Sequence, residues 1–340
     1  MNDCNSISIN FLPENKSLPF FSYGIFRPGE IAYGILEDLV DERKIEIKKI
    51  NGELKLRDGI LVYDNKKSGE IYGYLLHFKH GKEIEAYERI QKIEPKEYYT
   101  WNAEKSPYKG KFNILYAKSV TSGVDEAISE FDSSLFESLF STIWKDPFFI
   151  KGFQLLHELK CNNFFESTLN VKEYQTWHEE GNFNRYLKLQ MLYIFLWSLI
   201  ERFTFLAYGL GMNPNKRNIA LSNDSDLMKS VQKLMNDPNF NYFKSGFERE
   251  LSRTDSPGEK IKWKKNNGDE IDLKKMINFY YLLRSNITHR GKSGMRKSQL
   301  LSESFNELLF LIENLWEIKK EKALETKRRI DKIIKNEQTH

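Results

Sequence analysis

An arginine and a histidine lie five residues apart in FYYLLRSNITHRGKSGMRKS, residues 279–298, where an apolar run ends. Arg284 and His289 would meet at the tip of one predicted helix, because Gly291 follows and lets the chain turn. Histidine titrates near neutral pH and can carry a proton, and arginine offers a charged planar fork to phosphate oxygens. Asn286 can orient either group by hydrogen bonding. These residue types fit RNA cleavage without a metal, in which the ribose 2′-OH loses a proton while the phosphate gains charge.

That reaction needs both a base and an acid, and one copy of the chain supplies a single histidine at this helix tip. A two-fold dimer that places two tips face to face would supply both groups. A structural interpretation stays open at this point. In that interpretation Arg284 pairs with a glutamate, and His289 caps a carbonyl group at the helix end.

Further basic residues surround the arginine–histidine pair. Beside a phosphate-cleaving site, such charges would bind the RNA backbone. The alternative is an ordinary solvated loop. The residues concerned are Arg290, Lys292, Arg296 and Lys297.

The elements that must position the pair are helices. Residues 272–289 are expected to form one of them, with apolar side chains at three- and four-residue spacing facing the core. That predicted stripe consists of Met276, Ile277, Tyr280, Leu283 and Ile287. A longer helix over residues 182–208 would be capped at Asn182 and would end before Gly209.

The remaining C-terminal pattern predicts two more helices, at residues 226–235 and 298–336. The second half of the last helix loses its apolar stripe, so we expect it to project into solvent or to pair with another chain. Residues 256–273 are more polar and are expected to form a small hairpin that turns at Asn267-Gly268.

The stretch LLRSNITHRGK follows a long aromatic-rich helix that carries Glu201, precedes an amphipathic helix, and resembles the HEPN domain. The resemblance covers residues 182–340 and implies a dimerising helical bundle, which in many members is a metal-independent endoribonuclease. Arg284 and His289 match the arginine and histidine of that family's motif. Ser285 stands where an asparagine, aspartate or histidine is usual, and the asparagine follows one place later.

The first hundred residues predict a compact sheet or barrel with one or two helices. Residues 30–40, EIAYGILEDLV, are expected to form the first helix, and Asn51-Gly52 is a turn of the kind that closes hairpins. The expected strands are FFSYGIF (20–26), KIEIKKI (44–50), ELKLRDGILVYD (53–64) and EIYGYLLHF (70–78).

A second candidate site lies in SYGIFRPGE and IEPKEYYTW. Glycines at a strand end let backbone N–H groups converge on an anion. Glu94 lies beside an aromatic cluster of Tyr98, Tyr99 and Trp101, and a carboxylate held against aromatic surface has a raised pKa and can move a proton near neutral pH. The alternative is that Glu94 is a surface acid in a turn.

The order YG-x-x-RPG, then G-x-x-YG-x-L, then a glutamate before aromatic residues resembles the γ-glutamylcyclotransferase-like fold, a small mixed β-barrel, over residues 1–120. The resemblance implies that a loop binds a small γ-glutamyl ligand through backbone amides while Glu94 acts as acid and base. The matching loop residues are Tyr23, Gly24, Ile25 and Phe26. Ile25 replaces the usual serine or threonine, and Gln91 and Pro95 replace an aspartate and a glycine near the glutamate.

The 340 residues therefore predict an α+β chain of two domains, a small mixed β-barrel over 1–120 and an α-helical bundle over 181–340. Residues 121–180 would be a helical extension and connector, because 122–149 has helix-period apolar positions. A net charge of +4 permits a nucleic-acid partner without requiring one. The cysteines, Cys4 and Cys161, predict neither a disulfide framework nor a metal site.

The N-terminus MNDCNSISINF lacks the basic and apolar regions of a signal peptide, and the charges after MLYIFLWSLI interrupt any membrane-length run. We therefore expect a cytoplasmic, dimeric ribonuclease without a cofactor and without a membrane, whose N-terminal domain senses or processes a small molecule. The HEPN resemblance implies a toxin or anti-phage role with an antitoxin or defence partner. The alternatives are a cyclotransferase-type enzyme with an oligomerising helical domain and a non-catalytic sensor or scaffold.

Overall fold

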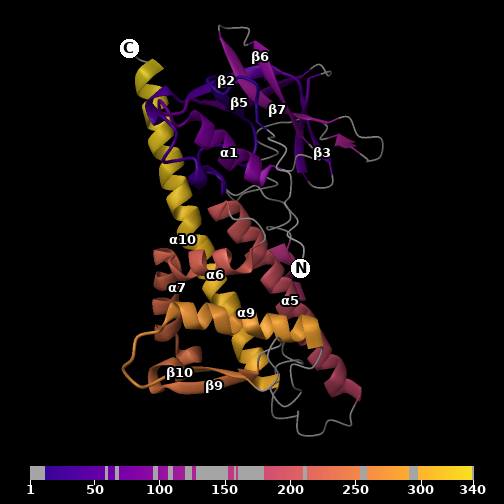
Figure 1. Cartoon of the computed structure of the whole chain (residues 1–340), viewed down its shortest axis with the longest axis vertical. Coiled ribbons are helices and arrows are strands. Elements are labelled where there is room, and N and C mark those ends of the chain that lie inside the picture. The colour runs from indigo at the N-terminus through magenta and orange to yellow at the C-terminus, as the bar shows by residue number, and fades with distance from the viewer. Residues whose placement is uncertain are drawn as a thin grey trace. The chain divides into compact units, whose positions relative to one another are not determined.

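The computed structural model describes residues 12–57, 60–65, 69–94, 99–105, 110–118, 125–127, 152–156, 158–159, 180–209, 213–252, 259–290 and 298–338. It combines sheets with long helices, so the predicted α+β class is confirmed (Figure 1). The chain divides into two compact units. The sheet unit comprises Met1–Pro147, Leu206–Gly211 and Lys322–His340, and the helical unit comprises Phe148–Phe205 and Met212–Glu321.

The sheet unit contains a five-stranded mixed sheet with the order β2-β5-β1-β7-β6 and a three-stranded sheet with the order β4-β3-β8. In the larger sheet β1 is antiparallel to β5 and parallel to β7, so the strand direction changes there. The strands are β1 (Phe20–Ser22), β2 (Glu46–Asn51), β3 (Glu53–Arg57), β4 (Ile60–Asp64), β5 (Glu70–Leu76), β6 (Tyr99–Lys105), β7 (Lys111–Ala117) and β8 (Asp125–Ala127).

Both faces of the five-stranded sheet are buried at β1, where the successive side chains of Phe20 and Phe21 point to opposite faces and are 3% and 0% exposed. Phe21 lies in one cluster with Leu54 and Tyr63 of the smaller sheet. Its neighbour Phe20 meets Trp101 edge to face, and Trp101 in turn contacts Tyr87 of the helix α1 (Glu83–Ile93). The sheet is therefore covered by a second sheet on one side and by α1 on the other.

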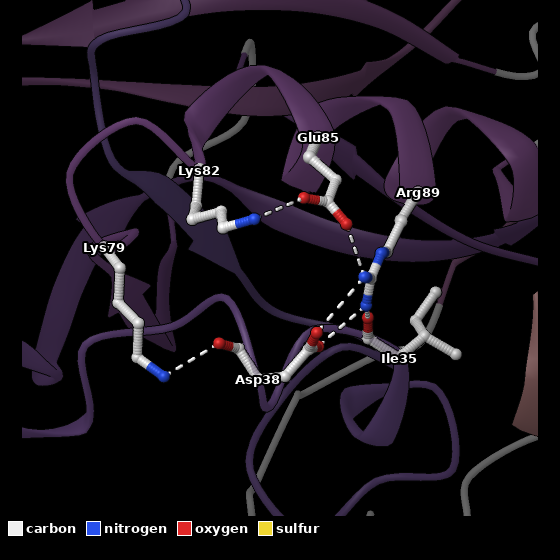
Figure 2. A network of polar contacts seen from close by, with 6 residues as sticks. All are labelled: Ile35, Asp38, Lys79, Lys82, Glu85 and Arg89. Atoms are coloured by element: carbon white, nitrogen blue, oxygen red, sulfur yellow. Dashed lines mark hydrogen bonds and ion pairs between the residues drawn. The ribbon is translucent and has the colours of Figure 1, made fainter.

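Residues 30–40 form turns with a single 3₁₀ turn at Tyr33–Ile35, so the helix predicted there is wrong. Arg89 of α1 holds this segment by hydrogen bonds instead (Figure 2). Its Nη1 donates to the Ile35 carbonyl oxygen and to Asp38 Oδ1, both at 2.7 Å, and its Nη2 donates to Asp38 Oδ2 at 3.1 Å. A side chain of the neighbouring helix thus takes a carbonyl group that a regular helix would pair internally.

The hairpin predicted at Asn51-Gly52 is also wrong, because β2 pairs with β5 whereas β3 pairs with β4 and β8. The chain changes sheets at Gly52. This glycine has a φ of 144°, and the ring of Tyr63 occupies the space where a Cβ would lie. The turn residues therefore serve the packing of two sheets rather than the closure of a hairpin.

The helical unit confirms the predicted helices and adds two that the sequence did not predict, α6 and the short α8. Gly209, with a φ of 61°, ends α5 as expected, but that helix begins at Glu180 and includes the predicted cap Asn182. The elements are α5 (Glu180–Tyr208), α6 (Pro214–Ser222), α7 (Ser225–Asn236), α8 (Tyr242–Ser245), β9 (Phe247–Ser252), β10 (Lys260–Lys265), α9 (Leu273–Arg290) and α10 (Ser298–Gln338).

The polar segment before α9 does form a hairpin, but not with the predicted turn. β9 and β10 pair from Phe247 with Lys265 to Ser252 with Lys260. Asn267-Gly268 therefore follows the second strand and leads into α9. Trp263, which is 2% exposed, packs against Phe279 of α9 and so fixes the position of the hairpin.

A buried ion pair joins β9, α9 and α10. Arg249 donates from Nη1 to Glu307 Oε2 at 2.8 Å and from Nη2 to Glu307 Oε1 at 2.6 Å. Tyr280 donates its hydroxyl to Oε2 at 2.6 Å, and Tyr242 donates to Oε1. The Glu307 side chain is 0% exposed. These hydrogen bonds replace the bonds to water that the carboxylate loses when it is buried.

The second half of α10 packs within the sheet unit, so the prediction that it projects into solvent or pairs with another chain is wrong. Ile330 and Ile334 are 0% and 6% exposed. Arg329 pairs with Glu37 at 2.7 Å and with Glu42 at 2.6 Å. Two buried isoleucines one turn apart pack this part of α10 against the sheet unit, but two residues are too few to be recognised as an apolar stripe in the sequence.

The segment Tyr186–Tyr208 of α5 is long and apolar enough to cross a membrane, judged by length and composition only. Half of its most apolar window is buried inside the protein, and one such helix is weak evidence for a membrane span. The helix predicted from the period of residues 122–149 is wrong at Asp125–Ala127, because these residues form β8 and pair with β3; the other residues of that stretch fall outside the described residues. Cys4 and Cys161 also lie outside them.

Candidate active site

α9 positions Arg284 because its apolar stripe is buried as predicted. Asp272 caps the helix: its Oδ1 accepts the Lys275 N–H at 3.0 Å, and this bond lowers the pKa of Asp272. Arg284 lies one turn beyond Tyr280, and its side chain is 27% exposed. The stripe residues Met276, Ile277, Tyr280, Leu283 and Ile287 are all at most 5% exposed.

Arg284 shares a carboxylate with a second arginine. Its Nη2 lies 3.9 Å from Oε1 of Glu201 on α5, and Nη2 of Arg217 on α6 lies 3.0 Å from the same oxygen. Trp197, one turn before Glu201, donates its Nε1–H to that oxygen at 3.0 Å. We call Glu201, Arg217 and Arg284 the shared-carboxylate cluster. Two positive charges face one negative charge in it, and Arg284 makes the longer ion pair.

Arg217 is the buried member of the cluster. Its side chain is 7% exposed, and its guanidinium carbon lies 6.0 Å from the ring centroids of both Trp197 and Tyr281. Burial lowers the pKa of Arg217, while the charge of Glu201 opposes this decrease and the charge of Arg284 adds to it. The Arg217 contact has the distance of an ion pair without the angle of a hydrogen bond.

The cluster therefore has an excess of positive charge at a partly exposed position. Within the described residues, the Nε atoms of both Arg217 and Arg284 are buried without a hydrogen bond. A guanidinium that is only partly neutralised attracts an anion, and its planar fork matches the oxygens of a phosphate or a carboxylate. Arg284 is the group that such an anion would meet, because Arg217 is covered by the two aromatic rings.

The other predicted residues of this half have different outcomes. Asn286 lies in α9 and is 7% exposed, so it belongs to the interior of the bundle rather than to its surface. His289 and Arg290 lie in the last turn of α9, but their side chains are outside the described part of the structure. The juxtaposition of the Arg284 and His289 side chains stays a prediction. Lys292, Arg296 and Lys297 fall outside the described residues.

In the sheet unit, the loop after β1 is built by its own backbone. The Gly24 carbonyl accepts the Arg27 N–H at 3.2 Å, and the Ile25 carbonyl accepts the Ala32 N–H at 3.2 Å. Arg27 pairs through Nη2 with Glu30 Oε1 at 3.0 Å, although both side chains are largely buried. Open space lies where a Cβ would project from Gly24, so the backbone is approachable there.

The second candidate site combines Tyr23 with Glu94, and the charge of Glu94 acts on Tyr23. Tyr23 is 6% exposed and donates its hydroxyl to the Leu115 carbonyl at 2.9 Å. Burial raises the pKa of Tyr23, and the negative charge of Glu94 raises it further. Glu94 ends α1, donates its N–H to Ile90 and is half-buried, while Phe26 is 1% exposed.

Sequence reasoning missed Arg217, Trp197 and Tyr281. A signal for α6 was present in NPNKRNIALS, because Asn213 accepts from the N–H groups of the first turn and Pro214 follows it. Nothing in that stretch indicates that Arg217 points inward. Its burial depends on the contact between α6 and α9, which lie 50 or more residues apart in the sequence.

No group of three histidine, cysteine, aspartate or glutamate side chains that could hold a metal ion occurs among the described residues. Comparisons of the chain with protein-family models, with curated proteins and with solved structures found no match.

Proposed function

We propose that the helical unit is a metal-independent endoribonuclease in which Arg284 binds the scissile phosphate and His289 moves protons. The observation that carries the proposal is the shared-carboxylate cluster, which leaves a partly exposed guanidinium, less than two turns from the end of α9, only partly neutralised. Arg284 meets a glutamate, as the structural alternative required, but that glutamate is already paired with Arg217 at the shorter distance. A single structural ion pair would not need the second arginine.

The reaction follows from the residue types. A neutral imidazole takes the proton of the ribose 2′-OH, and the 2′-oxygen attacks the adjacent phosphorus. The bond from phosphorus to the 5′-oxygen breaks, and an imidazolium gives that oxygen its proton. Arg284 stabilises the charge that develops on the phosphoryl oxygens. The products are a 2′,3′-cyclic phosphate and a 5′-hydroxyl, so no water and no metal ion is consumed in this step.

The two proton transfers require two imidazoles, which we propose come from two copies of the chain. α5 supports this assembly because it leaves apolar side chains uncovered along one stripe. Leu187 is 38% exposed and Met191 is 70% exposed. Half-buried Phe195 continues the stripe one turn further, and Glu201 of the cluster follows less than two turns later on the same helix. A second copy seated on this stripe would bring its own helix tip toward the cluster. Exposed apolar area of this kind marks an interaction surface.

For the sheet unit we propose a regulatory role, in which a small ligand binds at the loop of Tyr23, Gly24, Ile25 and Phe26. The approachable backbone at Gly24 and the acid near Tyr23 support it. The γ-glutamylcyclotransferase resemblance implies that the two sheets belong to a small mixed barrel. We place the protein in the cytoplasm, as a toxin or defence effector that acts on RNA with an antitoxin or defence protein as partner.

A cleavage assay tests the nuclease proposal. Purified full-length chain is incubated with a labelled single-stranded RNA in excess EDTA. Arg284→Ala is expected to slow cleavage about 100- to 1,000-fold, and His289→Ala about 100- to 10,000-fold. Lys274→Ala is the matched control, because it removes an exposed positive charge from the same helix away from the cluster. Equal rates in Arg284→Ala and Lys274→Ala would contradict the proposal.

A cyclotransferase activity of the sheet unit is the second candidate, because the charge of Glu94 reaches the loop tyrosine. In that reaction the α-amine of a γ-glutamyl compound attacks its own side-chain carbonyl and releases 5-oxoproline. Release of 5-oxoproline that Glu94→Gln abolishes, with RNA left intact by the unmodified chain, would favour this function over the nuclease.

A further inference from the structure

Two guanidinium groups compete for one oxygen atom in the helical unit. Glu201 Oε1 is 3.0 Å from Arg217 Nη2 and 3.9 Å from Arg284 Nη2. Trp197 adds a hydrogen bond to the same atom and so draws away more of its charge. The arginine that is closer is also the one that cannot reach a ligand, since its side chain is 7% exposed.

We infer that Arg217 is a positioning residue, which occupies Glu201 and thereby keeps the guanidinium of Arg284 available to a phosphate. Without Arg217, Glu201 would have Arg284 as the nearest cation, and the partly exposed arginine would close onto it. A carboxylate and a phosphate compete for the same fork of N–H groups. An arginine that is satisfied by Glu201 would therefore bind RNA weakly, although it would remain in the same place on α9.

The surroundings of Arg217 suit this role. The rings of Trp197 and Tyr281 lie 5.8 Å apart and both lie 6.0 Å from its guanidinium carbon, so its position is fixed on two sides. Cation–π contacts of this kind stabilise a buried guanidinium. Arg284 shows no such enclosure among the described contacts. The inference deepens the proposed function and rests on it for the identity of the anion, an RNA phosphate.

The test is a cycle of full-length variants: Arg217→Met, Glu201→Gln and the double substitution. Binding of a single-stranded RNA with 2′-O-methyl groups throughout, which cannot be cleaved, is measured by fluorescence anisotropy at several salt concentrations. Arg217→Met is expected to weaken binding roughly tenfold and to lower the slope of log K against log salt by about 0.7, the change for one lost phosphate contact. The double substitution is expected to restore both values to within about twofold of the original chain.

A second measurement does not depend on RNA. Phenylglyoxal modifies accessible guanidinium groups, and mass spectrometry reports its rate at Arg284. We expect slower modification in Arg217→Met and the original rate in the double variant. Arg217→Lys, which keeps the charge, should resemble the original chain in both measurements. Arg217→Gln replaces Arg217→Met if thermal melting shows that the methionine variant does not fold.

Two results would overturn the inference: unchanged binding and modification in Arg217→Met, or a double variant no better than that single one. A chain that neither binds nor cleaves RNA would end the nuclease proposal. In that case the modification rates at Arg284 alone still decide whether Arg217 controls it.

Discussion

Two glutamates of the helical unit hold arginines in opposite ways. Glu307 is 0% exposed, and each of its oxygens accepts one hydrogen bond from Arg249 and one from a tyrosine hydroxyl. Glu201 is 30% exposed and divides a single oxygen between Arg217 and Arg284. The first carboxylate is matched by its donors, whereas the second has more positive charge around it than it can neutralise.

The Glu307 pair stabilises the fold, whereas the shared-carboxylate cluster belongs to the candidate active site. A buried charge is tolerated only when it is paired and hydrogen-bonded on all sides, and the Glu307 pair meets this condition. It joins β9, α8 and α10 to Tyr280, one turn before Arg284, and so fixes the rotation of α9. The shared-carboxylate cluster does not meet the condition, and incompletely satisfied polar groups of this kind occur preferentially at functional sites.

The largest expected change in the free energy of unfolding comes from replacing the buried arginines, Arg249 and Arg217, one at a time. Arg249→Met leaves Glu307 buried without its cation and should lower the free energy of unfolding by about 3–5 kcal/mol. Arg217→Met should lower it by only about 1 kcal/mol, because Glu201 can be hydrated and can turn to Arg284. Urea denaturation followed by tryptophan fluorescence measures both. Equal losses in the two variants would remove the distinction between the clusters.

A smaller effect is expected from Tyr280→Phe, which deletes a single hydroxyl donor to Glu307. A hydrogen bond to a charged group contributes about 1.5–3 kcal/mol, so the free energy of unfolding should fall by that amount. Tyr281→Phe is the matched control, since that neighbour is half-buried and packs on Trp197 rather than on Glu307. A control variant as unstable as Tyr280→Phe would show that the hydroxyl of Tyr280 has no special role.

The smallest expected effect is a pH dependence that belongs to the Glu307 pair. Burial, followed by the charge of Glu307, raises the pKa values of Tyr242 and Tyr280 above the ordinary value. Above about pH 10 the unfolded chain loses tyrosine protons that the folded chain keeps, so stability falls as pH rises. The decrease in melting temperature from pH 8 to pH 10.5 should therefore be smaller in Tyr280→Phe than in the original chain. An unchanged difference would contradict this assignment.

The sequence predicted the parts of this comparison that depend on helical period. The stripe of α9 and the end of α5 at Gly209 follow from side-chain spacing and from the freedom of glycine. The burial of Glu307 also follows the helical period, because it lies three residues after Ser304 and four before Leu311, both fully buried. A carboxylate in such a stripe must have a buried partner, but the spacing cannot say that the partner is Arg249.

Local turn signals give wrong pairings. Asn267-Gly268 is a turn, but it follows the second strand of the hairpin, and Asn51-Gly52 lies between strands that pair in different sheets. The apolar spacing of residues 30–40 predicts a helix, whereas contacts with Arg89 impose turns. Arg217 shows the same limit in the candidate site. The side-chain direction of a short helix is decided by its neighbours, which are distant in sequence.

The most direct test of the account is the chemistry of the cleaved ends. A defined RNA is incubated with the full-length chain in EDTA beside the same sequence carrying 2′-O-methyl groups, and the products are identified by mass spectrometry. We predict a 2′,3′-cyclic phosphate and a 5′-hydroxyl from the RNA and no product from the methylated strand. Cleavage of both strands, or intact RNA after incubation with the folded chain, would contradict the claim that the helix tip acts through the ribose hydroxyl.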